Sequence, residues 1–288
     1  MNLDRFGILH GERILQIHAV DHCNNNCKDC NHYSLYAPQK EYSAEDYFSA
    51  LDILYERCWY PRYLVIIGGE PFLHPDLSGF VEKISNRYPF ASLSITSNGF
   101  WISEENLKRC ERIFQRLSRF IITVYPNMHK RINEAIPICD IKPLVCSMYP
   151  HLEVKVRDLV KRNKFYQANF DSKLDEGEYP QCGETRCSSL LPNGNLSRCS
   201  TIAYATASNK KFRFLLDYPD VFFNVFTWPE DFVQWLNRIP FDACARCPFA
   251  QPLTSFWSMD AAVPFNYDRE REALNRLKLL PVTAQTQG

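Results

Sequence analysis

The chain has 288 residues, and its 45% hydrophobic content is enough for one large α/β unit or for a main domain with a smaller one attached. Lysine plus arginine and aspartate plus glutamate both total 33, so the formal net charge is zero and no basic surface for nucleic acid is expected. No apolar run approaches the ~20 residues that cross a bilayer, and the N-terminus lacks the pattern of a signal peptide. We therefore expect a cytoplasmic protein that binds neither nucleic acid nor membrane.

Strands and helices alternate through residues 1–160, which predicts one α/β domain built of βαβ units around a parallel sheet. The run 63–67 is continuously apolar, as in a strand that is buried on both faces. The hydrophobic patterns and capping residues predict strands at 14–20, 63–67, 91–96, 120–125 and 152–156, and helices at 43–57, 77–88 and 103–117.

The composition changes after about residue 160. Residues 161–260 are rich in cysteines, turns and aromatic residues, with one clear helix at 230–238, and are predicted to form a small domain organised around metal. Residues 261–288 are predicted to form a C-terminal helix, at 268–279, followed by a tail.

Three cysteines follow the first predicted strand at the spacing C-x-x-x-C-x-x-C: Cys23, Cys27 and Cys30. In the reducing cytosol, cysteines at such short spacings are more often metal ligands than disulfides. Thiolates suit zinc or an iron–sulfur cluster. A closed zinc site needs four ligands, and His22 or His32 can complete one, whereas a cubane cluster with three cysteines keeps one iron open.

Two further signals stand where the next two strands end. Gly68, Gly69 and Glu70 follow the second strand, and Ser97 and Asn98 follow the third. Ligands bind at the carboxyl ends of parallel strands. Paired glycines let a backbone approach a ligand closely, and a carboxylate can pair with an ammonium group. We therefore expect all three signals to converge on one pocket.

The set CNNNCKDC, GGEP and TSNG resembles the radical S-adenosylmethionine superfamily over most of residues 14–160. The resemblance implies a partial (β/α) barrel in which Cys23, Cys27 and Cys30 hold a 4Fe-4S cluster. The open iron would chelate the methionyl amine and carboxylate of S-adenosylmethionine. One electron, from a donor such as flavodoxin or ferredoxin, would cleave it to methionine and a 5′-deoxyadenosyl radical, which abstracts a hydrogen atom from the substrate.

The resemblance also assigns the cofactor contacts. Glu70, with Gly68 and Gly69, would hold the ammonium group, and Ser97 and Asn98 would lie near the ribose. The family often has an apolar or aromatic residue before the third cysteine, where this chain has an aspartate at position 29. That departure affects the expected adenine contact more than the cluster.

A second group of cysteines consists of Cys182, Cys199, Cys244 and Cys247, in the pattern C-x11-G-x4-C and C-x-x-C. Asn193-Gly194 predicts a hairpin that returns Cys199 towards Cys182. Four thiolates suit one closed cluster or one zinc ion. The pattern resembles the twitch domain, a shortened form of the SPASM domain, and so implies a second 4Fe-4S cluster.

Cys187 has no place in this ligand set. It can be a packed thiol, a ligand in place of Cys182, or a catalytic hydrogen-atom donor, and we expect it on a loop that faces the mouth of the barrel. The four other cysteines are predicted to be small buried apolar residues: Cys58, Cys110, Cys139 and Cys146.

Three functions are compatible with these motifs. The first is oxidation or epimerisation of a carbohydrate-like small molecule, as in similar twitch-containing dehydrogenases and epimerases of aminoglycoside pathways. The second is modification of a ribosomal peptide. Against it, we expect no additional peptide-recognition domain before the barrel. The third is a non-catalytic zinc-binding interaction protein, which leaves the GGEP and TSNG segments unexplained.

Overall fold

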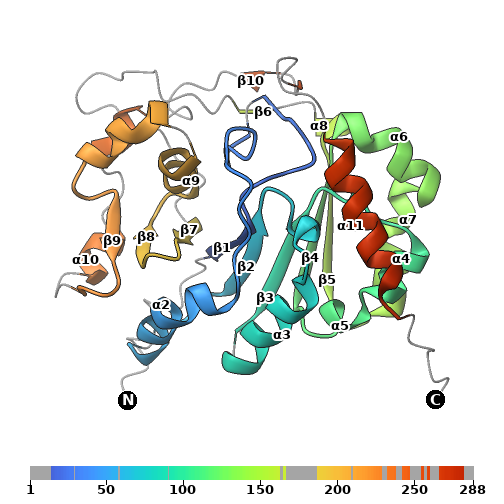
Figure 1. Cartoon of the computed structure of the whole chain (residues 1–288), viewed down its shortest axis with the longest axis horizontal. Coiled ribbons are helices and arrows are strands. Elements are labelled where there is room, and N and C mark those ends of the chain that lie inside the picture. The colour runs from blue at the N-terminus through green and yellow to red at the C-terminus, as the bar shows by residue number, and fades with distance from the viewer. Residues whose placement is uncertain are drawn as a thin grey trace.

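One open sheet organises the protein, seen here as a computed structural model (Figure 1). Its strand order is β5-β4-β3-β2-β1-β7-β8-β9. The structure describes residues 14–28, 30–57, 59–89, 91–162, 165–166, 187–208, 210–228, 232–237, 242–246, 254–255, 258–259 and 266–281.

The first five strands are parallel to their neighbours, and a helix lies between most consecutive pairs. The strands are β1 (Ile14–Val20), β2 (Tyr63–Gly68), β3 (Leu93–Ser97), β4 (Arg119–Val124) and β5 (Glu153–Asp158). The helices are α2 (Glu45–Glu56), the 3-10 turn η1 (Pro71–Leu73), α3 (Leu77–Arg87), α4 (Glu104–Arg109), α5 (Glu111–Phe114), α6 (Pro126–Ala135), α7 (Ile138–Met148) and α8 (Leu159–Arg162). The predicted α/β class is confirmed, and the open parallel sheet is compatible with a partial barrel.

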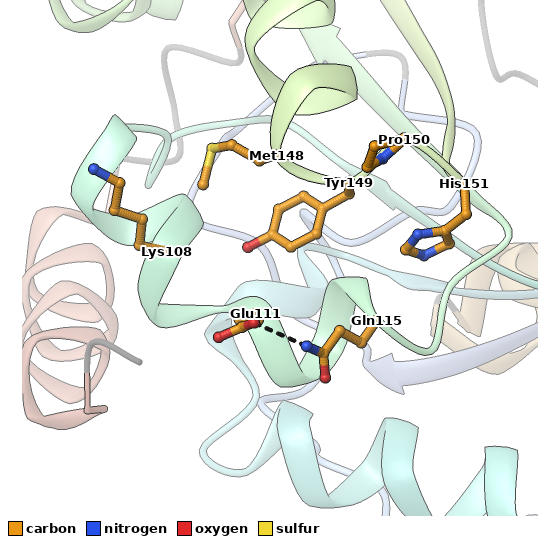
Figure 2. A pocket seen from close by; sticks show the side chains of 7 residues that line it. All are labelled: Lys108, Glu111, Gln115, Met148, Tyr149, Pro150 and His151. Carbon is orange, nitrogen blue, oxygen red and sulfur yellow. Dashed lines mark hydrogen bonds between the residues drawn. The ribbon is translucent and has the colours of Figure 1, made fainter. Parts of the chain in front are cut away.

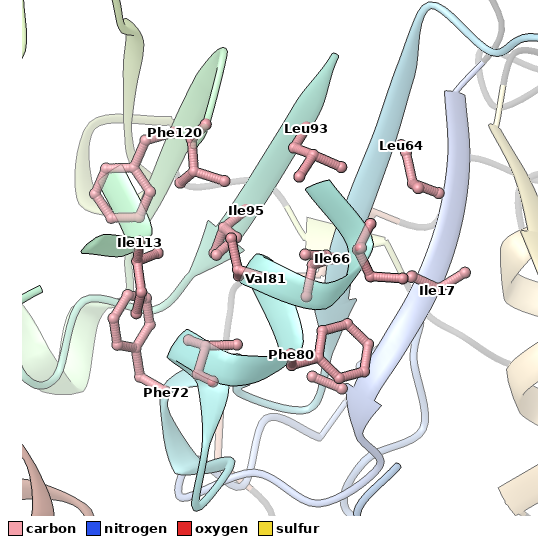
Figure 3. Packing of buried hydrophobic residues seen from close by; sticks show 14 of the residues in the cluster. Ile17, Leu64, Ile66, Phe72, Phe80, Val81, Leu93, Ile95, Ile113 and Phe120 are labelled. Carbon is pink, nitrogen blue, oxygen red and sulfur yellow. The ribbon is translucent and has the colours of Figure 1, made fainter. Parts of the chain in front are cut away.

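Side chains of the strands alternate between a helix-covered core and the opposite, more polar face. Figure 3 shows the core side, where Ile17, Ile66 and Ile95 from neighbouring strands point towards Phe80 and Val81 of α3. Each such side chain, fully buried, contributes ~1.5–3 kcal/mol to stability. The opposite face carries the side chains that reach the functional site.

The later part of the chain adds strands to the same sheet. β7 (Cys187–Leu190) pairs parallel with β1, and β8 (Asn195–Ser197) and β9 (Phe222–Asn224) follow in antiparallel order. The hairpin predicted at 193–194 lies between β7 and β8, where Gly194 has φ +81°. The sheet is thus continuous across residue 160, while the domain boundaries themselves stay a prediction.

A smaller apolar cluster lies beyond β7 and includes Tyr33 from the cysteine loop together with Ile202 and Tyr204. The elements here are α9 (Ser200–Ser208), η2 (Lys210–Asp217), α10 (Phe232–Asn237) and η3 (Asp242–Arg246), while β6 (Phe165–Tyr166) pairs with β10 (Thr254–Ser255). The last helix, α11 (Tyr267–Leu279), returns to the main domain and buries Ala273 and Leu277 in its core (Figure 1). In the part of the chain that is described, no helix is long and apolar enough to span a membrane.

The predicted strands agree with the structure to within two residues at either end, but the helices differ at 103–117, at 126–148, at 159–162 and at 200–208. The helix predicted at 103–117 is two helices, because the backbone leaves helical geometry at Cys110 (φ −88°, ψ 13°). Neither α6 nor α7 was predicted, since Pro126 and Pro143 mask the pattern; Pro126 occupies the first turn of α6, where no amide donor is needed. Helix α9 was not predicted either, because its first seven residues are all buried and show no polar face.

The close approach of the chain at the carboxyl ends of β1 and β2 depends on two glycines. A Cβ at Gly69 would lie 1.8 Å from the carbonyl oxygen of His22, and one at Gly68, which has φ +142°, would lie 1.9 Å from that of Val20. The amide of Gly69 donates to Val20 O at 2.9 Å. The ends of these strands can therefore meet only without side chains at the two positions.

We expect Gly69→Ala to destabilise the protein by ~1–3 kcal/mol, because backbone has to move to admit the methyl group. Gly79→Ala is the matched control. The three atoms nearest to its Cβ all belong to the side chain of Asp76, which can turn away if it gives up its hydrogen bond from the Gly79 amide. The gain in helix propensity offsets this weakened cap. Thermal unfolding of both variants measures the difference, and equal midpoints would contradict the close approach.

Candidate active site

A cavity at the carboxyl ends of β1 to β4 brings together the three signals predicted from sequence. Its lining comes from the cysteine loop, from the glycines after β2, and from the ends of β3 and β4. The lining residues are Cys23, Asn25, Cys27, Cys30, Asn31, His32, Ile67, Gly68, Gly69, Thr96, Ser97, Asn98, Thr123 and Tyr125. Parallel sheets place ligand sites at this edge, and the predicted convergence is confirmed.

Asparagines hold the cysteine loop in shape. Asn24, Asn25 and Asn26 are all buried. The side-chain amide of Asn98 donates to Asn24 Oδ1 at 2.8 Å and lies 3.7 Å from Cys23 Sγ. The side-chain amide of Asn24 donates in turn to Glu270 on α11 at 3.1 Å, and Glu270 also pairs with an arginine of α6. The loop is therefore fixed to β3 and to the C-terminal helix by uncharged amides.

The three thiols fit an iron–sulfur cluster. Burial raises the pKa of the Cys23 thiol well above its ordinary value, and the nearby charges of Glu70 and Cys27 raise it further. Three thiolates around one cavity need a positively charged group, which a cluster supplies. Among the described residues, no group of three or more His, Cys, Asp or Glu side chains is arranged to hold a metal ion. A cluster spreads its cysteines over separate irons.

The carboxylate of Glu70 is fully buried and joins the ends of β2 and β3. Its Oε1 accepts from Ser97 Oγ at 2.8 Å and from the Phe72 amide at 3.1 Å, and its Oε2 accepts from the Asn98 amide at 2.6 Å. Burial raises the pKa of this carboxyl to about 7, although the three hydrogen bonds act in the opposite direction. Glu70 is absent from the residues that line the cavity. Its contact with the ammonium group stays a prediction, and the strand-joining role was missed from sequence.

Ser97 and Asn98 line the cavity while belonging to the same network. Ser97 Oγ accepts from the indole of Trp101 and from the Gly99 amide, both at 3.0 Å. Asn98 Oδ1 accepts from the Phe100 amide at 3.0 Å. These bonds shape the TSNG turn, and the contact of either residue with a ribose stays a prediction.

Sequence reasoning also missed a chain of buried polar side chains beside the cavity. His18 Nδ1 lies 2.7 Å from an Asp21 carboxylate oxygen, and His18 Nε2 lies 3.2 Å from Nδ1 of His32. The ring of Tyr204 from α9 stacks on His18 with centroids 3.6 Å apart. Burial, followed by the effect of His18, lowers the pKa of His32 to about 3, so the imidazole at the cavity is neutral. The sequence signals this chain of polar side chains only through the inward position of His18 on β1.

The second cysteine group is described only in part. Cys199 and Cys244 both pack against the smaller apolar cluster, which brings these two distant positions to one small core. Cys182 and Cys247 lie outside the described residues. The four-cysteine ligand set therefore stays a prediction.

Cys187 does not lie on a loop at the mouth of the barrel, and that prediction is wrong. It is the first residue of β7 and pairs with Ile14, where β1 begins, whereas the metal-binding loop follows Val20, where β1 ends. Six residues of strand separate the two levels, or ~20 Å. The hydrogen-donor role of Cys187 stays a prediction, and this separation does not favour it.

The other cysteines only partly follow the prediction that they are buried. Cys110 is buried in the main core and Cys146 packs against it half-buried, but Cys139 is exposed. Cys139 precedes Asp140 in the first turn of α7, where its thiol contacts that carboxylate, so it belongs to the outer surface of the helix layer. Cys58 lies outside the described residues.

A second cavity lies on the helix-covered side of the sheet and contains none of the predicted site residues (Figure 2). It lies between α4, α5 and the segment that follows α7. Figure 2 shows Glu111 and Gln115 joined by a hydrogen bond of 2.8 Å beneath the ring of Tyr149. The phenol of Tyr149 is committed to a backbone carbonyl, that of Leu107, so the groups here stabilise the helix layer.

Residues 17–139, which include the strands that form the cysteine-lined cavity, match the Radical SAM superfamily. Two curated relatives, each named GTP 3',8-cyclase 3, from Mycobacterium bovis and Mycobacterium tuberculosis, are 26% identical over 137 residues. The alignment covers 46% of this chain and 35% of each relative, so the chain spans about a third of their length.

Solved structures similar to this chain include BtrN in complex with AdoMet and 2-DOIA, at 15% identity and a TM-score of 0.43, covering 71% of this chain and 85% of BtrN. Streptococcus suis SuiB bound to the precursor peptide SuiA is 13% identical with a TM-score of 0.38, covering 83% of this chain and 67% of SuiB. Both TM-scores lie below 0.5, too low to carry a functional comparison.

The raised pKa of Glu70 predicts a pH dependence of stability in the metal-free protein. The folded carboxyl has a pKa of about 7, against 4.5 for an ordinary one, so its contribution is full below pH 4.5 and is lost as pH rises through 7. Relative to Glu70→Gln, which cannot titrate, the protein should lose up to ~3 kcal/mol of unfolding free energy between pH 5 and pH 8. Chemical unfolding of both proteins measures this, since histidine effects cancel in the comparison. A difference that does not change with pH would show an ordinary pKa for Glu70.

Proposed function

We propose that this protein is a radical S-adenosylmethionine enzyme that holds a 4Fe-4S cluster on Cys23, Cys27 and Cys30 and binds S-adenosylmethionine in the adjoining cavity. The observation that carries the proposal is the common cavity of the three cysteines with Gly68, Gly69, Ser97 and Asn98. The match of residues 17–139 to the Radical SAM superfamily supports it, because that family implies both groups.

When bound, the cluster supplies the one electron that cleaves S-adenosylmethionine to methionine and a 5′-deoxyadenosyl radical. The protein's own groups bind and orient the cofactor. The backbone at Gly68 and Gly69 lines the cavity without side chains, so a ligand can approach its amides and carbonyls closely. Glu70 holds the TSNG turn in place through its hydrogen bonds from Ser97 and Asn98, and we propose that its negative charge also attracts the ammonium group.

We further propose that the substrate is an uncharged, hydroxyl-rich small molecule of carbohydrate type. Apart from the cysteines, the described lining consists of amides, hydroxyls, a neutral imidazole and apolar groups. Asn31, His32, Thr96 and Thr123 can all exchange hydrogen bonds with hydroxyl groups. Among the described residues, no arginine, lysine or carboxylate side chain lines the cavity, which favours such a substrate over a charged one.

Oxidation is the reaction that we propose, in preference to epimerisation. Epimerisation needs a hydrogen donor on the opposite face of the substrate. The thiol considered for that task, Cys187, lies on β7 beside Ile14, at the end of β1 away from the cysteine loop. We also propose a second 4Fe-4S cluster in a twitch-like unit on Cys182, Cys199, Cys244 and Cys247. The packing of Cys199 and Cys244 against one apolar cluster supports this unit.

Replacing Cys23, Cys27 and Cys30 together by alanine should remove about half of about eight irons per chain and abolish cleavage of S-adenosylmethionine. The loss follows because no other described thiol lines the cavity. Anaerobic reconstitution, iron analysis and an assay for 5′-deoxyadenosine provide the measurement, with the exposed Cys139→Ala as the matched control. Cleavage by the triple variant would refute the proposed function.

Cys199→Ala and Cys244→Ala should each lower the iron content to about four per chain and leave the iron on the first loop in place. The half-buried Cys146→Ala, on α7, should keep all of it. Iron and sulfide analysis after reconstitution separates these outcomes. Full iron in both variants would mean that the second group of cysteines binds no cluster.

A further inference from the structure

Asn25 donates to the sulfur atoms of two of the three loop cysteines. Its backbone amide lies 3.3 Å from Cys23 Sγ, and its side-chain Nδ2 lies 3.2 Å from Cys27 Sγ. The residue is 6% exposed, as is Cys27, so water competes little for either hydrogen bond. One buried residue thus directs two N–H groups at the thiols that would bind the cluster.

A second asparagine fixes which way the Asn25 side chain faces. Nδ2 of Asn127, in the first turn of α6, donates to Asn25 Oδ1 at 2.8 Å. With its oxygen taken up in this way, the Asn25 amide presents its N–H to Cys27. The reverse orientation would place the amide oxygen against a thiolate, so only one orientation of the Asn25 amide satisfies both hydrogen bonds.

Hydrogen bonds to a ligating sulfur act on the electron affinity of a cluster. A reduced cluster carries one more negative charge than an oxidised one, so N–H donors stabilise the reduced form and raise the reduction potential. The effect is strong where the site is dry, because no solvent replaces a lost donor. Both conditions hold around Asn25.

We propose that Asn25 is a positioning residue whose side chain raises the reduction potential of the cluster through Cys27, and that Asn127 holds its amide in the donating orientation. This inference rests on the proposed function, because it requires the cluster on the cysteine loop. It assigns a task to the second asparagine of CNNNC that the spacing of the cysteines does not reveal.

The test uses Asn25→Leu, which keeps the shape of the side chain and removes its donor, and Asn127→Leu, which touches no sulfur. Asn133→Leu is the matched control, since Asn133 lies on the same helix and, among the described residues, accepts from the amide of Ile138 and contacts none of the loop cysteines. Each reconstituted protein is analysed for iron and then titrated with reductant, with the reduced cluster on the first loop followed by electron paramagnetic resonance. The readout does not depend on turnover.

At the midpoint potential of the unmodified protein, the ratio of reduced to oxidised cluster should fall about tenfold in Asn25→Leu. For one electron, this is a reduction potential lowered by about 59 mV. It should fall less, about threefold, in Asn127→Leu, which acts through Asn25. Asn133→Leu should leave the ratio unchanged.

Unchanged ratios in both test variants, with iron intact, would overturn this inference alone. If Asn25→Leu fails to hold the cluster, Asn127→Leu decides the matter. Loss of the cluster from both would show that the amides hold the loop in shape and do not tune it, which also overturns the inference. Absence of any cluster on the first loop of the unmodified protein would instead overturn the proposed function.

Discussion

The buried carboxylate of Glu70 accepts hydrogen bonds from a hydroxyl and from two backbone amides, and so joins the end of β2 to the turn after β3. The amide of Glu70 donates to the carbonyl of His22 at 3.1 Å, which joins the same point to the start of the cysteine loop. Three strand ends are thereby held around one residue. The cavity keeps its shape because these bonds are out of water, where leaving any one of them unmade would cost ~1–3 kcal/mol.

The groups that surround the thiols are mostly neutral. Amides of Asn24, Asn25 and Asn98 contact the loop, and the imidazole of His32 is kept neutral by burial. A neutral and largely dry environment strengthens the electrostatic interactions of any charged group placed inside it. The charges of the proposed cluster and of the sulfonium cofactor would therefore act strongly on one another, with little screening from the protein.

The sequence predicted the parts of the site that depend on local pattern. Strand ends could be located because the strands have recognisable apolar patterns, continuous at 63–67 and interrupted by polar residues in the strands before the cysteine and TSNG segments. The strand-joining role of Glu70 could not be predicted, because its partners are backbone amides that only the folded turn presents. The Asp21–His18–His32 chain was missed for a similar reason, since its members meet only after the loop folds back on β1. Cys187 was misplaced because its pairing with Ile14 joins residues far apart in the chain.

The most direct test of the central claim is the electron paramagnetic resonance spectrum of the anaerobically reconstituted, reduced protein before and after S-adenosylmethionine is added. Three cysteines leave one iron of the cluster open, so the cofactor should bind that iron and change the signal of the reduced cluster. We predict a clear shift of this signal when S-adenosylmethionine is added. Adenosine, which lacks the methionyl group, should cause no shift. A reduced cluster signal that S-adenosylmethionine leaves unchanged would contradict the assignment of this cavity.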